Sequence, residues 1–154
     1  MGFHMPDLTA DELGSLPLGR LLLYAHRRAQ AASLAKLQQR GHAQVRPGHL
    51  PVITNLDADG TRISDLANRA GMTRQMMGRL VRELEDLDYV DSRSDPTDQR
   101  AVIVTLTERG TRFLADAPEA IEDVERDYAD LLGPDELRQL RAALVKLSTT
   151  SPTA

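Results

Sequence analysis

The stretch that decides the fold is LANRAGMTRQMMGRLVRELEDLDYV, residues 66–90. A short helix is predicted to begin near Leu66, with Ser64 as its candidate N-cap. Gly71 supplies the positive φ angle that a tight turn favours, and Thr73 is the candidate N-cap of a second helix. Two short helices joined by a glycine-containing turn are the pattern of a helix-turn-helix.

The second helix separates into an apolar and a basic side when its residues are placed at 100° intervals. The predicted apolar side carries Met76, Met77, Leu80, Val81, Leu84 and Leu87. The opposite side carries Gln75, Gly78, Arg79 and Arg82, with Arg74 at its margin. An α-helix fits the major groove of DNA, and side chains of its N-terminal half reach the base edges. The basic side therefore predicts a DNA-reading surface, and the alternative is a solvated charged face.

The N-cap residue and the residues of the basic side each have an expected role. Arg74, Gln75 and Arg79 are expected to read bases. Thr73 and Arg82 are expected to bind the phosphate backbone. Gly78 lies on the same side and is expected to let the helix approach DNA closely, whereas Asp86 would repel phosphate and end the contact.

Two antiparallel strands are predicted next, residues 89–93 and 101–106, joined by the turn SDPTDQ. Arg93 and Arg100 flank this turn, and a narrow hairpin tip that bears arginine suits the minor groove or its phosphates. Asp98 lies two residues before Arg100, so both side chains point to one side of a strand and can form a charge-assisted bond. For Asp98 the favoured alternative is a structural role that orders the hairpin without touching DNA.

The helices on either side of this region are predicted to be long. Residues 16–40 form one helix that ends at Gly41, and residues 45–56 form a short, less regular helix in which Pro51 fits poorly. Thr107 is the candidate N-cap of another long helix, which Pro118 is expected to kink. A last helix, which starts after Gly133 and Pro134, carries leucines at 137, 140, 144 and 147.

Charge is distributed very unevenly along the chain. The formal net charge is −4, yet residues 13–56 contain no Asp or Glu, whereas residues 116–136 hold nine carboxylates against Arg126 alone. Binding of a polyanion depends on the local potential of one face, so the negative total does not exclude DNA binding. The basic first helix and the acidic stretch are candidates for ion pairing, within a subunit or across a dimer, with solvated faces as the alternative.

Composition excludes several classes of protein. The 154 residues contain no Cys, which removes disulfides and thiolate metal sites and fits a reducing cytosol. The longest apolar run, residues 21–25, is far shorter than the roughly 20 residues of a bilayer span, so a cytoplasmic protein without membrane contact is expected. The histidines do not cluster with acidic neighbours at ligand spacing, and neither a metal nor a cofactor is predicted. Met5 is a candidate native start, which would make the preceding residues an artificial extension.

Residues 63–110 resemble the winged helix-turn-helix of the MarR family of bacterial transcriptional regulators. The resemblance rests on LANRAGMTRQMMGRLVRELEDLDYV, on Arg93, and on DPTDQRAVIVTLTERG at residues 95–110. Its most specific part is Asp98, Arg100 and Ala101 with the LTERG that ends at Gly110. The chain departs from the family at Asp88, where a glycine usually turns into the wing and where Asp can adopt the left-handed conformation, and at HLP, residues 49–51.

The resemblance implies a mainly α fold with a small β-hairpin wing. The expected divisions are an N-terminal dimerisation helix region at 6–45, the DNA-binding domain at 46–110 and C-terminal dimerisation helices at 111–150. The chain would be a sequence-specific regulator, expected to be a repressor, that binds a pseudo-palindromic site on double-stranded DNA as a homodimer. Two recognition helices related by a two-fold axis would reach successive major grooves about 34 Å apart.

Family members often bind aromatic acids between the dimerisation helices and the reading head. This implies a small aromatic or anionic effector, for which Tyr24, Arg28, Arg46 and His49 are candidate residues, with ordinary surface charge as the alternative. A second reading of the whole chain is a winged-helix protein-interaction module that does not bind DNA. The sequence shows no paired carboxylates in a plausible cleft and no nucleophile with a nearby base, so an enzyme is not predicted.

Overall fold

The computed structural model of the chain describes residues 8–149, so the predicted start at Met5 lies outside the described residues. In chain order the elements are α1 (Ala10–Gly14), α2 (Leu18–Leu37), the π-turn η1 (Gln38–His42), the 3-10 turn η2 (Pro47–His49), α3 (Leu50–Ile53), β1 (Thr61–Arg62), α4 (Ile63–Arg69), α5 (Arg74–Asp86), β2 (Val90–Asp95), β3 (Asp98–Leu106), α6 (Glu108–Leu132) and α7 (Pro134–Thr149). The predicted fold class, mainly α with a small β wing, is confirmed.

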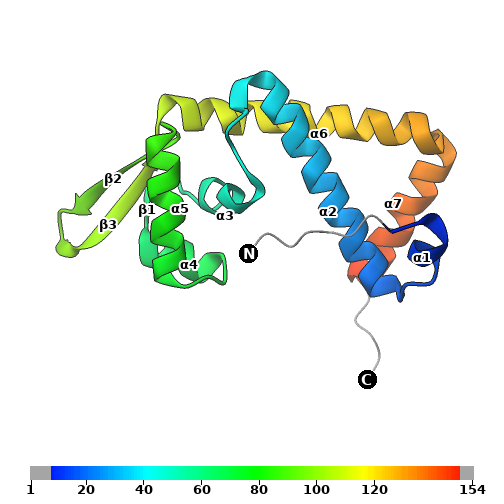
Figure 1. Cartoon of the computed structure of the whole chain (residues 1–154), viewed down its shortest axis with the longest axis horizontal. Helices are drawn as coiled ribbons and strands as arrows, with labels where there is room; N and C mark the ends of the chain where they lie inside the picture. The colour runs from blue at the N-terminus through cyan, green and yellow to red at the C-terminus, as the bar shows by residue number, and fades with distance from the viewer. Residues whose placement is uncertain (1–7, 150–154) are drawn as a thin grey trace.

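Helix α6 spans most of the length of the molecule and joins its two ends, and the β2–β3 hairpin extends beyond its start (Figure 1). At one end lie α4, α5 and a three-stranded antiparallel sheet with strand order β1-β3-β2. At the other end α1, the start of α2 and α7 gather below α6. None of the helices described between residues 8 and 149 is long and apolar enough to cross a membrane.

The wing hairpin is longer than predicted. Strands β2 and β3 pair from Val90 opposite Leu106 to Asp95 opposite Asp98, so Pro96 and Thr97 alone form the turn. Asp98 therefore lies on strand β3 rather than in the predicted six-residue turn, and Arg100, predicted to flank that turn, also lies on β3.

The helix-turn-helix forms much as predicted, with one wrong N-cap. Helix α4 begins at Ile63 with Arg62 as its N-cap residue, so Ser64 lies inside the first turn. The reason is strand β1, which pairs with β3 and leads directly into α4. Thr73 does cap α5, because its Oγ1 accepts a hydrogen bond from the Met76 N–H at 3.2 Å.

The apolar side of α5 packs into the core, but Met76 does not. Met77, Leu80, Val81 and Leu84 are buried. The Met76 side chain is 39% exposed, which corrects its predicted place on the apolar side. One residue step turns a helix by 100°, so Met76 sits at the boundary when Met77 is central.

The N-terminal helices differ from the prediction in their bounds. Helix α2 starts at Leu18, and the missed helix α1 precedes it with a Thr9 capping box. Gly41, with φ at +100°, ends the helical run as predicted. The predicted single helix over residues 45–56 is two short ones, η2 and α3, and Pro51 occupies the first turn of α3, where proline is tolerated.

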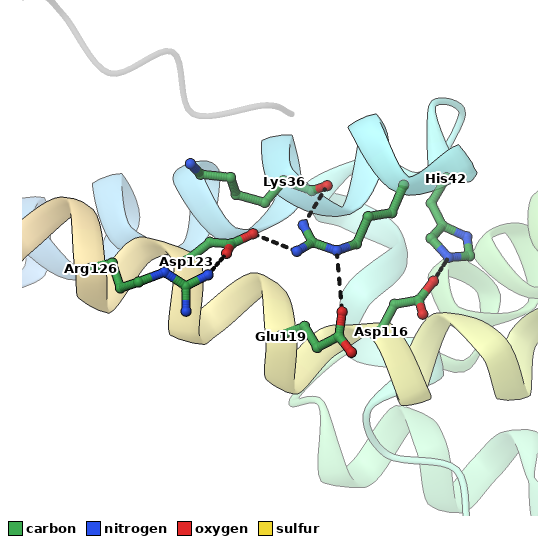
Figure 2. A network of polar contacts seen from close by, with 7 residues as sticks. Lys36, His42, Asp116, Glu119, Asp123 and Arg126 are labelled. Carbon is green, nitrogen blue, oxygen red and sulfur yellow. Dashed lines mark hydrogen bonds and ion pairs between the residues drawn. The ribbon is translucent and has the colours of Figure 1, made fainter.

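Ion pairs join α2 and η1 to α6 within one chain, which is one of the arrangements that the segregated charges left open (Figure 2). Lys36 Nζ lies 2.9 Å from Asp127 Oδ2, and Arg40 Nη2 lies 2.5 Å from Asp123 Oδ2. The hydrogen bond from Arg40 lowers the pKa of Asp123, although partial burial opposes the shift. Helix α6 continues unbroken through Pro118, so the expected kink does not divide it.

Candidate nucleic-acid interface

The polar face of α5 is open to solvent at the sheet end of the molecule. A shallow hollow on this face is lined by Thr73, Gln75, Met76, Arg79 and Arg82. Arg74, the first residue of α5, extends toward the wing, where its Nη2 is 3.5 Å from the Arg100 carbonyl oxygen. The structure thus brings four of the predicted residues together on one surface: Thr73, Gln75, Arg79 and Arg82. Arg74 connects this surface to β3.

Gly78 keeps the middle of this face low. A Cβ atom placed on Gly78 would have Arg82 Nη1 as its nearest neighbour at 3.8 Å, which is ordinary contact with a flexible side chain. Nothing within the described chain therefore requires glycine at this position. An approaching surface outside the chain would explain it.

The wing carries the other residues that the sequence places in the DNA-binding surface. Arg93, Asp98 and Arg100 are all exposed. Asp98 Oδ1 accepts a hydrogen bond from the Arg100 backbone N–H at 3.0 Å. Asp98 thus orders the backbone of β3, whereas the sequence predicted that it would hold the Arg100 guanidinium.

A buried carboxylate, missed from the sequence, ties the wing to strand β1. Asp95 is 3% exposed, and its Oδ2 accepts from Nε of Arg62 at 2.7 Å. Its other oxygen, Oδ1, accepts from the Thr97 N–H at 2.8 Å and from the Thr97 hydroxyl at 2.7 Å. The bonds from the Thr97 hydroxyl and amide, with the Arg62 guanidinium, lower the pKa of Asp95 to about 2. The sequence placed Asp95 only in turn chemistry, because the two-residue strand that carries Arg62 shows no pattern.

A second cluster joins η2 to α5 around Glu83. Glu83 Oε2 lies 2.6 Å from Nη2 of Arg46 and 3.1 Å from Nε2 of His49, and Oε1 lies 3.6 Å from Nε of Arg79. The hydrogen bond from His49 and the nearby arginines lower the pKa of Glu83 despite partial burial. Two of the residues predicted to bind a ligand, Arg46 and His49, are therefore partners of the recognition helix.

The remaining candidate ligand residues lie elsewhere. Tyr24 and Arg28 are on α2, and neither lines the apolar groove of about 280 Å³ that opens between α2, α3 and α6. The apolar lining of this groove includes Leu34, Leu37, Leu50, Phe113, Leu114 and Ile121, and its polar lining consists of His26, Gln30, Ser33 and Thr54. The four predicted ligand residues are not brought together, and none of them faces this groove.

His42, at the end of η1, contacts both α6 and the residue that precedes strand β2. Its ring is buried, with Nδ1 2.8 Å from the Tyr89 hydroxyl and Nε2 3.0 Å from Asp116 Oδ2. The sequence showed no acidic partner near the histidines along the chain, and the carboxylates that do contact them, Asp116 and Glu83, are distant in sequence and close in space. Among residues 8–149 no group of three or more potential ligands could hold a metal ion.

Comparisons with known proteins agree with this geometry. A family model described as the MarR family matches residues 43–101. The transcriptional regulator TcaR of Staphylococcus aureus is 25% identical over 95 residues, which cover 60% of this chain and 63% of TcaR. The transcriptional activator ExpG of Rhizobium meliloti is 24% identical over 84% of this chain and 66% of ExpG. The chain thus spans less than two thirds of the length of either relative.

The solved structures include the transcriptional repressor CouR bound to a 23-mer DNA duplex. CouR is 27% identical, with a TM-score of 0.66 over 92% of this chain and 99% of CouR. These relatives are named as transcriptional regulators and not as enzymes, in agreement with the sequence, which predicts no catalytic site. The helix-turn-helix region of this chain thus matches the MarR family model, and the chain as a whole is similar in fold to CouR.

Proposed function

We propose that this protein is a sequence-specific DNA-binding transcriptional regulator that acts in the cytoplasm. The observation that carries the proposal is the exposed face of α5, where Arg79 and Arg82 line one hollow with Thr73 and Gln75. A helix presented in this way has the dimensions and the donors that the major groove of DNA accepts. Arg74, Gln75 and Arg79 are proposed to read bases, with Thr73 and Arg82 on the backbone.

The wing is proposed to contact the adjacent minor groove or its phosphates. Arg93 and Arg100 are exposed on β2 and β3, and a short two-residue turn makes the hairpin narrow. Asp98 is proposed to act on Arg100 through the backbone bond that it accepts, so its contribution to DNA binding is indirect.

A homodimer is proposed because α7 and the end of α6 expose apolar side chains. Helix α7 has no buried residue, and Leu140, Leu144, Val145 and Leu147 are exposed on it. Leu131 of α6 is 78% exposed at the same end. Burying these side chains against a second copy would remove apolar surface from water. The divisions at 6–45, 46–110 and 111–150 then separate the dimerisation helices from the DNA-binding domain.

The groove between α2, α3 and α6 is the proposed effector site. Its lining is mainly apolar, and His26 is its one titratable group. This composition favours a neutral or weakly polar aromatic ligand over a strongly anionic one. We propose repression as the mode of action, the mode named for CouR, rather than the activation named for ExpG. We further propose that a ligand of this kind relieves the repression.

The decisive experiment is selection of bound sites from random duplex DNA, followed by affinity measurements on the selected site. A two-fold symmetric site is expected, and Arg79→Ala is expected to lose discrimination against random DNA by about 1 to 3 kcal/mol. Arg126→Ala is the control, because Arg126 is also exposed and ion-paired but lies on α6. Equal weakening on both DNAs would make Arg79 a phosphate contact. Absence of DNA binding at every salt concentration would favour the protein-interaction module instead.

A further inference from the structure

Arg46 extends the basic surface of the recognition helix from outside that helix. It precedes η2, its side chain is 66% exposed, and its Nη2 donates to Oε2 of Glu83 at 2.6 Å. Glu83 lies one helical turn after Arg79 on α5, and its Oε1 is 3.6 Å from Arg79 Nε. One carboxylate therefore has a guanidinium from α5 on one side and a guanidinium from the residue before η2 on the other.

The position of Arg46 is fixed by its surroundings. The Arg46 N–H donates to Nδ1 of His49 at 3.2 Å, and His49, which is 1% exposed, has Nε2 3.1 Å from Glu83. Because Nδ1 accepts this bond, Nε2 of the neutral ring carries the proton and donates it to the carboxylate. A Cβ atom on Gly48 would stand 3.9 Å from Leu80, so η2 packs directly on α5.

The guanidinium of Arg46 has N–H groups that donate no hydrogen bond to residues 8–149. Among the contacts within residues 8–149, the Arg46 side chain donates through Nη2 alone, to Glu83. The N–H groups on Nε and Nη1 remain for a further acceptor, and a guanidinium fork matches the oxygens of a phosphate. The charges also favour an anion here, because the two guanidiniums of Arg46 and Arg79 outweigh the single carboxylate of Glu83.

We propose that Arg46 binds a phosphate of the DNA backbone beside the groove that α5 enters, and that Glu83 positions it. This inference rests on the proposed function, since it adds a contact to the same DNA surface. It reassigns Arg46 from the effector site, where the sequence placed it. It also explains why a carboxylate so near Arg79 is compatible with DNA binding.

The test is the salt dependence of binding, measured by fluorescence anisotropy on the selected operator and on a random duplex. Removing one phosphate-binding side chain lowers the slope of log affinity against log salt by about 0.9, so a dimer of Arg46→Ala should show a slope smaller by about 1.8. The weakening should be equal on the two DNAs, because a phosphate carries no base information. Arg46→Lys keeps the charge and should restore most of the slope.

Arg126→Ala is the matched control. Arg126 is 67% exposed and, like Arg46, shares a carboxylate with a second arginine, but it lies on α6, where it contacts Asp123 (Figure 2). It should keep the wild-type slope. An unchanged slope in Arg46→Ala, an equal decrease in Arg126→Ala, or failure of Arg46→Lys to restore the slope would each overturn the role of Arg46. If the wild-type protein binds neither DNA, the proposed function fails and the Arg46 contact fails with it.

Discussion

Arg62 holds the carboxylate of Asp95 from across the hairpin, with Nε 2.7 Å from Oδ2, and so fixes the tip of the wing to the strand that precedes the helix-turn-helix. The Arg62 Nη2 also reaches the Thr97 hydroxyl at 3.3 Å. The two wing arginines, Arg93 and Arg100, lie on the strands that this contact anchors. This ion pair, whose carboxylate is buried, therefore helps to set the angle at which the wing meets α4 and α5.

Asp95→Asn should lower stability at neutral pH and cost progressively less as the pH falls. The pKa of Asp95 in the folded chain is about 2, against 3.8 for the ordinary group. A folded-state pKa below the unfolded one gives stability that is complete above the unfolded pKa and is lost as pH falls through the folded pKa. The difference between wild type and variant should be constant above about pH 5 and narrow from about pH 4 toward pH 2.

Urea unfolding at a series of pH values measures this difference. Asp91→Asn is the control, because Asp91 is exposed on the same strand and should differ little from wild type at any pH. A gap between wild type and Asp95→Asn that stays constant down to about pH 2.5 would contradict the role of the Asp95 carboxylate.

Gly110→Ala should destabilise the chain strongly, because α6 passes against the backbone at the start of the wing. A Cβ atom on Gly110 would stand 2.1 Å from the Tyr89 carbonyl oxygen and 2.9 Å from Leu106 Cδ2. The carbonyl belongs to the backbone and cannot move aside as a flexible side chain would. We expect a loss of about 3 kcal/mol or more in the free energy of unfolding.

Gly78→Ala separates the steric clash expected at Gly110 from the effect of replacing glycine by alanine in a helix that has space for the methyl group. Gly78 is in the interior of α5 with space around it, so alanine there should stabilise the helix by roughly 0.5 to 1 kcal/mol. The same variant should bind DNA more weakly if the helix approaches the groove at this point. A variant that is more stable and binds DNA as tightly as wild type would exclude close approach at Gly78.

The buried ring of His42 should contribute more to stability than the hydroxyl it contacts. His42→Ala leaves a cavity beside Phe113 and removes the partner of Tyr89 and Asp116, for an expected loss of roughly 2 to 4 kcal/mol. Tyr89→Phe removes one hydrogen bond and should lose about 1 kcal/mol. Denaturant unfolding checks both, with the exposed His26→Ala as the control. Similar losses for His42→Ala and His26→Ala would show that the ring is not a packing element.

Sequence signals that act between near neighbours were enough to predict the helix-turn-helix and the turn into the wing. Thr73 and Gly71 are signals that act over three or four residues, and Asp88 adopts the left-handed φ of +63° that its place before the wing implied. The contacts that hold the head in place are not local. His42 meets Asp116 across 74 residues, and Arg62 meets Asp95 across 33. Helical periodicity carries no information on such pairs, and only the opposite charge of whole segments indicated that α2 and α6 would meet.

Exchanging the charges of Arg40 and Asp123 should show that the ion pair between η1 and α6 stabilises the folded chain. Arg40→Glu should lower the melting temperature by several degrees, because the new carboxylate would face Asp123 and Glu119. Asp123→Arg should also destabilise, since it would face Arg40. The double variant should recover part of the loss, and the coupling measured by the double-mutant cycle should shrink as salt screens the charges. Recovery should be incomplete, because Arg126 and Glu119 would then face like charges.

Exchange of the exposed pair Arg138 and Asp135 is the control, and the melting temperature of that double variant should stay near that of wild type. Additive losses in the double Arg40 and Asp123 variant would mean that the two side chains do not interact within the folded chain.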